Sequence, residues 1–415
     1  MRRYLSKFEF TPQLIESAIY DCLNGVGNSN SRWKRMDSAY FLAEYLIYFS
    51  RDKDKNKHDL AREIHDYIMK YENYRMKFNP LIKVISRNIH HEIVNHEINL
   101  PPIRYQMRRD NCSGKLRKIG LASIKQQIYD HIVVKACMGM FMNKIGQYQC
   151  ASIRGRGQVY GKETIEKWIR KNPKKCKYVW KGDVKKFYPS IPHDKLKKLL
   201  RRDIKNNDVL YVVFRLIDTY GEDIGLCIGS YLSQFLANYY LSYAYHFLSE
   251  KCFTTRKKRR TKEIIQVRLI SYQLLYMDDI ILFSPNKKYL KKCVNMLSKY
   301  LNDELGLSIK DGHQLFPLDS RPIDMMGYKI YTYKTTIRKR IFKRTNIILA
   351  TYKDPKKVMN VETARAFMSY KGYLDHSDSV KYRKKMKFKR TFKNAKEVIR
   401  NYAKYSGVHG QTTWL

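Results

Sequence analysis

The sequence lacks several features that mark common protein classes. The two nearest of its eight cysteines, Cys137 and Cys150, are 13 residues apart, so no Cys-x-x-Cys pair indicates a zinc ribbon or a dense disulfide framework. No apolar run approaches the ~18 residues that a membrane span requires. The N-terminus "MRRYLSKFEF" has no apolar stretch of the kind found in secretory signals. We therefore expect an intracellular, soluble protein with reduced thiols and no membrane partner.

Acidic residues are also scarce. The 415 residues include 82 Lys and Arg against 38 Asp and Glu, a formal net charge of +44. Repulsion among so many positive charges destabilises an isolated compact protein, and contact with a polyanion would relieve it. The basic residues are spread through the chain among 34 tyrosines, which favours a groove for a nucleic-acid backbone and stacked bases over the alternative, an anionic membrane surface. At 44% hydrophobic residues, the chain is long enough to bury a core and to divide into several subdomains.

Residues 1–100 are predicted to be mainly helical. In "TPQLIESAIYDCLN", Thr11 is placed to cap a helix and Pro12 to occupy its first position. Apolar residues then recur at spacings of three to four. The segment "HHEIVNHE" is similar to a zinc-protease helix, but His91 would need a second histidine at the position of Asn95. We expect no metal site there.

The rest of the chain alternates between strand and helix patterns. Residues 101–180 are basic and contain "IRGRGQVYG", which is either a phosphate cradle or a simple turn. "YVWKGDVKKFYPSIP" predicts a strand that ends at Asp183, followed by a turn. "KYLKKCVNMLSKYLNDELGLSI" predicts an amphipathic helix that leads into a strand, and "DMMGYKIY" predicts one short strand. "RKKRRTK" is interpreted as a solvated loop on the side that would face a nucleic-acid duplex, and residues 331–415 as basic helices.

The segment "LLYMDDIILFS" carries two adjacent aspartates between apolar runs. It predicts a β-hairpin with Asp278 and Asp279 exposed at its tip. By itself a hairpin tip with two acids is often only a solvated turn. Asp183, at the end of another predicted strand, adds a third carboxylate. Two Mg²⁺ ions held by carboxylates on neighbouring strands stabilise the attacking and leaving oxygens of a nucleotidyl transfer.

Five segments in this order resemble the successive palm motifs of reverse transcriptases: "KGDVKKFYPSI", "IGLCIGSYLSQFLANYYL", "YMDDIILFS", "LGLSIK" and "MMGYKI". The resemblance implies an α+β right-hand polymerase, an RNA-directed DNA polymerase with fingers, a palm built on an antiparallel sheet, and a helical thumb. The expected divisions are an N-terminal helical extension (1–100), fingers (101–180), palm (181–330) and basic thumb (331–415).

The resemblance also assigns the metal ligands. Asp183 and Asp278 become the principal ligands, Asp279 a supporting carboxylate, and the Val184 backbone carbonyl a further oxygen donor. The implied cofactor is a pair of Mg²⁺ ions, with Mn²⁺ as a substitute.

Five further residues receive substrate-binding roles from the same resemblance. Tyr188 falls at the position of a steric gate that rejects the 2′-hydroxyl of a ribonucleotide; an ordinary core aromatic is the alternative. In "DNCSGKLRKIG", Arg117 and Lys115 would bind the incoming triphosphate, with Lys115 alternatively a solvated surface charge. Lys310, at the end of "LGLSIK", and Gln234, in "IGSYLSQ", are also expected at the substrate.

The segment "IGSYLSQ" indicates a lineage within the family. Many members carry Gln before its glycine, where it checks the incoming base, whereas here Ile228 precedes Gly229. This pattern resembles reverse transcriptases of diversity-generating retroelements, and related bacterial lineages that include group II intron-like and defence-associated enzymes. Because an apolar side chain removes a hydrogen-bonding check, reduced fidelity is a hypothesis.

Three settings follow from this resemblance. The first is anti-phage defence in the bacterial cytoplasm, with deoxynucleotides, a structured noncoding RNA as template, and a cDNA product. The second is mutagenic copying in a diversity-generating retroelement, with a small accessory protein. The third is a non-catalytic RNA-binding scaffold. The N-terminal extension favours defence slightly, and a homo-oligomer is compatible with each setting.

Overall fold

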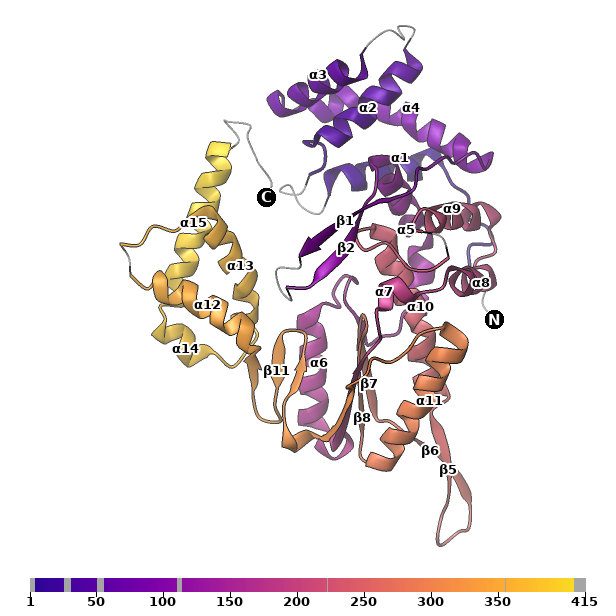
Figure 1. Ribbon diagram of the computed structural model, residues 1–415, viewed down its shortest axis with the longest axis vertical. Coiled ribbons are helices and arrows are strands. Elements are labelled where there is room, and N and C mark those ends of the chain that lie inside the picture. The colour runs from indigo at the N-terminus through magenta and orange to yellow at the C-terminus, as the bar shows by residue number, and fades with distance from the viewer. Residues whose placement is uncertain are drawn as a thin grey trace. The chain divides into compact units, whose positions relative to one another are not determined.

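The computed structural model describes residues 4–25, 31–50, 56–109, 114–221, 223–354 and 356–406. The chain forms two compact units, each built from three stretches of sequence. The first unit comprises residues 1–147, 184–249 and 297–309, and the second comprises residues 148–183, 250–296 and 310–415. Each unit is described separately below, and Figure 1 gives the element labels. The four divisions expected from the sequence stay predictions.

Helices dominate the N-terminal part of the first unit, which confirms the prediction for residues 1–100. They are α1 (Pro12–Asn24), α2 (Met36–Phe49), α3 (Lys57–Lys70) and α4 (Tyr74–Val94). Thr11 caps α1, because its hydroxyl accepts a hydrogen bond from the backbone N–H of Leu14 at 3.2 Å. The buried side chains of α1, such as Ile15 and Ile19, recur at helical spacing and form one packed face.

The rest of the first unit consists of a β-hairpin and further helices. They are β1 (Arg104–Arg109), β2 (Leu116–Leu121), α5 (Ile124–Lys144), α7 (Phe187–Ser190), α8 (His193–Asp203), α9 (Asn207–Asp218), most of α10 (Tyr231–Glu250) and the end of α11 (Lys287–Leu305). Helix α5 packs against both α1 and α9. A capping box formed by Ser123 and Gln126 fixes its start.

A five-stranded sheet organises the second unit, in the order β3-β7-β8-β4-β9. Its strands are β3 (Gln149–Cys150), β4 (Tyr178–Asp183), β7 (Tyr272–Tyr276), β8 (Asp279–Ser284) and β9 (Gln314–Pro317). All neighbouring pairs are antiparallel except β3 with β7. Helix α6 (Gln158–Lys171) packs on one face, where Ile165 and Trp168 join Val179, Ile281 and Phe283 in a buried cluster.

A small sheet and a group of helices complete the second unit. The sheet consists of β10 (Ile323–Met325), β11 (Tyr328–Ile330) and β12 (Thr335–Ile337). The helices are α12 (Lys339–Thr351), α13 (Val361–Asp375), α14 (Val380–Lys385) and α15 (Phe388–Ser406). They surround a core that includes Leu349, Phe367 and Ala395. The prediction of a helical C-terminal region is confirmed for the part that the structure describes, and Figure 1 shows these helices in orange to yellow.

Three local predictions need correction. "DMMGYKIY" forms two strands, because Met326 (φ 55°) and Gly327 (φ 85°) make a tight turn between β10 and β11. The segment after α11 forms only a single bridge, between Ile309 and Val184, instead of a strand. "RKKRRTK" is not simply a loop: its first two residues end the strand β5 (Phe253–Lys257), which pairs with β6 (Ile264–Arg268).

Over the residues that the structure describes, no helix is both long enough and apolar enough to cross a membrane.

Candidate active site

The centre of the five-stranded sheet brings the predicted carboxylates together. Strands β4 and β8 are paired in a register that sets Asp183 opposite Asp279. Along each strand, side chains alternate between the two faces. Asp183 therefore shares a face with buried Val179, and Asp279 shares one with buried Phe283. The two aspartates lie at the ends of their strands, on the same face as Val179 and Phe283, as the sequence predicted for a site on neighbouring strands.

Gly182 is required by the packing directly before Asp183. On the opposite face of β4, the indole of Trp180 folds over position 182, and a Cβ there would lie 2.2 Å from its ring. The buried Trp180 is itself fixed, because its Nε1 donates to His313 Nδ1 at 3.1 Å. The "KGD" sequence is thus explained by a close approach that holds the end of β4 in place.

Asp278 lies in the turn between β7 and β8, where Met277 has a φ of 52°. The predicted hairpin is confirmed, but Asp278 and Asp279 are half-buried at its tip instead of exposed. Burial, followed by the neighbouring charge of Asp183 and a hydrogen bond with that carboxyl, raises the pKa of Asp278 to about 7. Two carboxylates in contact resist simultaneous ionisation. A cation between them would remove this repulsion.

Asp279 has different surroundings. Burial raises the pKa of Asp279 above its ordinary value, although the charge of Lys181 acts in the opposite direction. Lys181 Nζ lies 3.9 Å from the Asp279 carboxylate. Lys181 Nζ also donates to the Asp324 backbone carbonyl at 2.6 Å, and the Asp324 carboxylate pairs with Arg338 at 2.7 Å. Asp279 therefore takes part in an alternating series of charges that reaches β10 and the start of α12.

Two neighbours of Asp183 were also predicted site residues. Lys310 Nζ lies 3.7 Å from the Asp183 carboxylate, and the Lys310 backbone N–H donates to the Asp183 carbonyl at 2.7 Å. Val184 follows Asp183 in the chain and forms the bridge with Ile309. Two hydrogen bonds define this bridge: the Lys310 N–H donates to the Asp183 carbonyl, and the Lys185 N–H donates to the Ser308 carbonyl. Neither bond uses the Val184 carbonyl.

These oxygen donors fit a divalent cation in part. Carboxylate and carbonyl oxygens are the ligands that Mg²⁺ and Mn²⁺ prefer, and the Asp183–Asp278 pair needs positive charge. Among the described residues, however, no group of three or more His, Cys, Asp or Glu side chains is close enough to hold a metal ion. The observed pair therefore consists of Asp183 and Asp278, and the supporting role of Asp279 stays a prediction.

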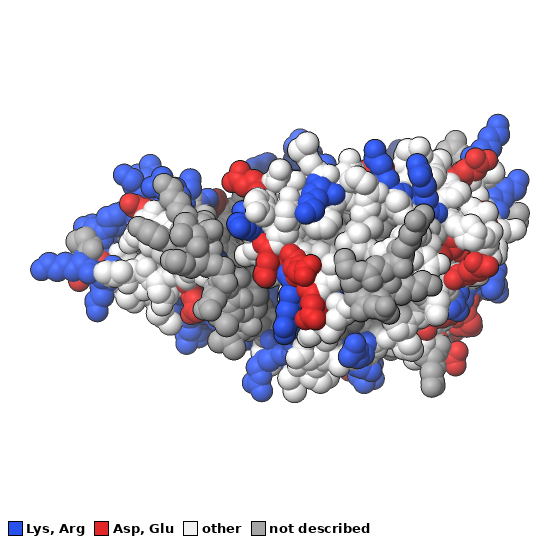
Figure 2. Space-filling model, turned by 90° about the horizontal axis from the view of Figure 1, so that it is seen from above, with Lys and Arg blue, Asp and Glu red and all other residues white. Residues whose placement is uncertain are grey.

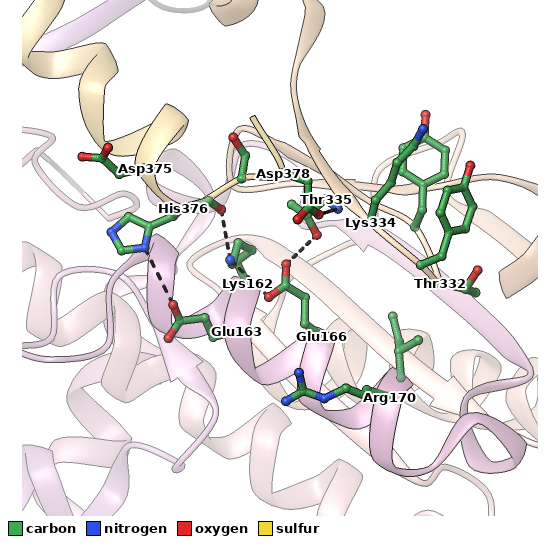
Figure 3. Close-up of a pocket in the computed structure, with 14 residues that line it drawn as sticks. Lys162, Glu163, Glu166, Arg170, Thr332, Lys334, Thr335, Asp375, His376 and Asp378 are labelled. Carbon is green, nitrogen blue, oxygen red and sulfur yellow. Dashed lines mark hydrogen bonds and ion pairs between the residues drawn. The ribbon is translucent and has the colours of Figure 1, made fainter. Parts of the chain in front are cut away.

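A separate cavity in the second unit does not contain these aspartates. It measures about 440 Å³ and is lined by α6, the β11–β12 turn and the end of α13. As Figure 3 shows, its charged groups bind one another: Lys162 pairs with Glu166 at 3.1 Å and donates to the His376 carbonyl at 3.0 Å, while Glu163 lies 3.8 Å from the His376 ring. These contacts tie α6 to the C-terminal helices.

The first unit carries the residues predicted to bind the nucleotide, apart from Lys310. In the β1–β2 hairpin, Arg117 lies directly opposite Arg108, and both are exposed. Like charges directly opposite each other on paired strands are destabilising. An anion such as a triphosphate would stabilise this pair of arginines, and the role of Arg117 stays a prediction. Lys115 is exposed and precedes β2 in the chain.

The loop that contains Ile228 and Gly229 is hydrogen-bonded to the same hairpin. The Gly120 N–H donates to the Ile228 carbonyl at 2.8 Å. Gly229 has a φ of 118°, and a Cβ on it would lie 2.9 Å from the Gly120 carbonyl oxygen. Only glycine readily adopts this conformation. The glycine of "IGSYLSQ" therefore permits close contact between the loop and β2, while Ile228 is half-buried.

Asp130, on α5, was missed by the sequence analysis. Its carboxylate accepts hydrogen bonds from the Ser230 hydroxyl at 2.7 Å and the Tyr231 N–H at 3.0 Å. The Ser230 hydroxyl also lies 3.0 Å from the hydroxyl of Tyr220. Asp130 is fully buried, and this burial raises its pKa to about 6. It fixes the start of α10 immediately after Gly229. A sequence signal existed, since Asp130 stands at helical spacing from buried Val133.

Tyr188 and Gln234 also lie in the first unit. Tyr188 is half-buried while its neighbour Phe187 is fully buried, so Tyr188 is not a core aromatic. Its backbone carbonyl accepts from the Leu226 N–H at 2.8 Å, which joins it to the segment before Ile228. Gln234 lies half-buried on α10. Six of the predicted nucleotide-binding residues therefore lie in the first unit, whereas Lys310 lies in the second unit with the three aspartates.

A mainly antiparallel sheet with paired carboxylates at a hairpin, together with a basic hairpin elsewhere in the chain, fits a nucleotidyltransferase of the polymerase class. Residues 107–330 match the family model described as reverse transcriptase (RNA-dependent DNA polymerase). Because the match covers more than half of the chain, the protein belongs to the reverse transcriptase family. It is an RNA-directed DNA polymerase with an α+β right-hand fold, and this family uses divalent metal ions.

Comparisons with individual proteins add less. A telomerase structure from Candida tropicalis, in complex with the TWJ fragment of telomeric RNA, covers 98% of this chain and 79% of its own, with 13% identity and a TM-score of 0.43. The apo telomerase from the same organism, truncated from its C-terminal domain, covers 79% of this chain and 76% of its own, with 15% identity and a TM-score of 0.40. No curated protein sequence matches this chain.

Proposed function

We propose that this protein is a bacterial reverse transcriptase that copies a structured noncoding RNA into cDNA during anti-phage defence. The observation that carries the catalytic part is the contact between Asp183 and Asp278, two acids whose mutual repulsion calls for a divalent cation. In this proposal Asp183, Asp278 and the Val184 carbonyl hold Mg²⁺, or Mn²⁺ as a substitute, and Asp279 supports them. When bound, the metal ions activate the primer hydroxyl and neutralise charge on the triphosphate.

The remaining site residues bind and select the nucleotide. Arg117 and Lys115 hold the triphosphate of the incoming deoxynucleotide through charge-assisted hydrogen bonds. Lys310 neutralises Asp183 and contacts the substrate. Tyr188 excludes the 2′-hydroxyl of a ribonucleotide. Gly229 keeps the base-checking loop against β2, where its close approach to Gly120 supports such a role.

Ile228 and the N-terminal helices support the biological setting. Ile228 replaces the glutamine found in many members of the family, as in the bacterial lineages named above. The four helices α1 to α4 precede the segment that matches the family model and supply a surface for an RNA partner. In the bacterial cytoplasm, the partners would be the noncoding RNA, deoxynucleotides and the cDNA, with a homo-oligomer compatible with this arrangement.

Mutagenic copying in a diversity-generating retroelement is the second candidate. It is favoured by the same residue, Ile228, because an apolar side chain cannot make the hydrogen bond through which glutamine checks a base. It would add a small accessory protein as partner. A non-catalytic RNA-binding scaffold is the third candidate, and the presence of all three aspartates argues against it.

Strand-specific sequencing of the RNA and DNA that copurify from the native host tests this proposal. The parent is compared with Asp278→Asn and with a control, Asp319→Asn, at an exposed position outside the site. We expect one RNA to be enriched with all three proteins, and complementary DNA to be absent only with Asp278→Asn. A cDNA that accumulates on phage challenge supports defence, whereas systematic errors in the cDNA support diversification. RNA without any Asp278-dependent DNA supports the scaffold.

A further inference from the structure

The strands β5 and β6 form a two-stranded ribbon that contains none of the site residues described above. Phe253 pairs with Arg268 at its base, and Lys257 pairs with Ile264 four residues further along the strand. The pairing continues past the strands, since the Lys258 N–H donates to the Glu263 carbonyl at 2.9 Å. In Figure 1 the ribbon extends away from the five-stranded sheet of the second unit.

Positive charge is concentrated on this ribbon. Residues 253–268 contain seven Lys and Arg residues and one acidic residue, a net charge of +6. The single acid, Glu263, pairs with Lys258 at 2.7 Å. Exposed basic side chains occupy both strands and the turn: Arg256, Lys257, Arg259, Arg260, Lys262 and Arg268. On the face of the molecule drawn in Figure 2, by contrast, Lys and Arg lie at separate points with acidic side chains among them.

The base of the ribbon is fixed to the second unit. The Leu269 N–H donates to the Cys252 carbonyl at 3.0 Å, and Lys292 of α11 donates to the Thr254 hydroxyl at 3.1 Å. The guanidinium of Arg268 lies 5.6 Å from the centre of the Phe253 ring. An anchored base holds the strands in one direction, so the basic turn is presented at a defined distance from the sheet.

Protection of exposed strand edges is the bland explanation of such charge, because edge lysines discourage pairing between molecules. It accounts for Arg256 and Lys257, which lie within β5. It does not account for Arg259, Arg260 and Lys262, which lie in the turn, where there is no strand edge to protect. The charge in the turn therefore requires another reason.

We propose that the β5–β6 ribbon binds the phosphate backbone of a double-stranded stem in the RNA partner. The only aromatic side chain of residues 253–268 is Phe253 at the base, so the ribbon offers no platform for stacking unpaired bases. A paired stem presents mainly phosphates and 2′-hydroxyls. These groups match the exposed Lys, Arg and Gln side chains of the ribbon. This inference rests on the proposed use of a structured RNA.

The test measures binding of an RNA hairpin with a paired stem to the full-length protein by fluorescence anisotropy over a series of KCl concentrations. The ribbon variant replaces Lys257, Arg259, Arg260 and Lys262 by Gln. We expect its affinity for the stem to fall roughly tenfold or more, and the slope of log K against log salt to fall by about 3, since each lost phosphate contact contributes about 0.7 to 0.9. A second variant changes only the turn, Arg259, Arg260 and Lys262, and leaves the strands intact.

A charge-matched control replaces four exposed lysines elsewhere in the second unit, Lys171, Lys174, Lys175 and Lys177. An equal loss of affinity in this control would overturn the proposal, because net charge alone would then explain binding. An equal or larger loss for unpaired oligouridine would overturn the preference for a stem, and stronger ribbon-dependent binding of a DNA duplex would overturn the choice of RNA. Aggregation of the ribbon variant with unchanged RNA affinity would favour edge protection.

The binding assay contains neither nucleotides nor Mg²⁺, so its outcome is independent of DNA synthesis. A parent protein that binds the stem through the ribbon but makes no DNA would refute the proposed function and leave this inference intact. A parent protein that makes DNA but does not bind the stem through the ribbon would refute only the role proposed for the ribbon.

Discussion

The ionisation of Asp130 provides a quantitative test of the hydrogen bonds that fix the segment after Gly229. Its carboxyl is fully buried, and its pKa is raised from 3.8 to about 6, with burial as the largest cause. Hydrogen bonds from Ser230, Leu232 and Tyr231 lower the pKa but do not offset this effect. The ionised form is therefore disfavoured in the folded protein compared with the unfolded chain.

The direction of the pH effect follows from linkage. A folded-state pKa above the unfolded value means that the folded protein binds more protons between these two values. The stability contributed by protonated Asp130 is fully present below pH 3.8 and is lost as the pH rises through about 6. The shift is about 2 pKa units, which corresponds to about 3 kcal/mol of unfolding free energy at about 1.4 kcal/mol per unit.

The assay is urea unfolding followed by tryptophan fluorescence between about pH 4 and pH 7. We expect the parent to lose about 3 kcal/mol relative to Asp130→Asn over this range, because the variant has no carboxyl to ionise. Ser230→Ala is the matched control: it keeps the carboxyl but removes a hydrogen bond that lowers its pKa, so the loss should extend to higher pH. Parallel stability curves for the parent and Asp130→Asn would refute the reasoning.

Three further predictions concern nucleotide selection. Gly229→Ala places a Cβ 2.9 Å from the Gly120 carbonyl oxygen at a φ of 118°, which costs about 1–3 kcal/mol of strain. The variant should therefore have a higher KM for deoxynucleotides in steady-state extension. An unchanged KM would contradict a role for the loop in nucleotide binding. Tyr188→Ala should increase ribonucleotide incorporation while Tyr188→Phe does not, measured as the ratio of kcat/KM values; equal ratios would contradict the steric gate. Ile228→Gln should lower misincorporation in sequenced products, and error spectra equal to those of the parent would contradict the fidelity hypothesis.

Patterns set by local physics were predictable from the sequence. The two apolar runs on either side of the aspartates in "LLYMDDIILFS" predicted the β7–β8 hairpin, and the strand pattern before Asp183 predicted β4. The capping pair Thr11 and Pro12 predicted the start of α1. In each of these segments the preference of the local sequence agrees with the packing that follows, so the pattern and the structure coincide.

Features that depend on tertiary contacts were not predictable in the same way. The turn in "DMMGYKIY" requires Met326 at positive φ, which single-residue preferences disfavour. The basic run at 256–262 resembles a loop because its charge hides the strand pattern on either side. Helical spacing from Val133 indicates that Asp130 is buried, but its hydrogen bond to Ser230 depends on the packing of α5 against the start of α10. Exposure of Asp278 and Asp279 was overestimated because neighbouring elements cover the hairpin tip.

The central claim is that Asp183 and Asp278 form the catalytic pair of an RNA-directed DNA polymerase. The most direct test is extension of a DNA primer on an RNA template with Mg²⁺ and deoxynucleotides, comparing the parent with Asp183→Asn, Asp278→Asn and the exposed control Asp319→Asn. The account predicts full-length cDNA with the parent and the control, and a loss of at least about a hundredfold with either site variant. Equal synthesis by the parent and both site variants would contradict it.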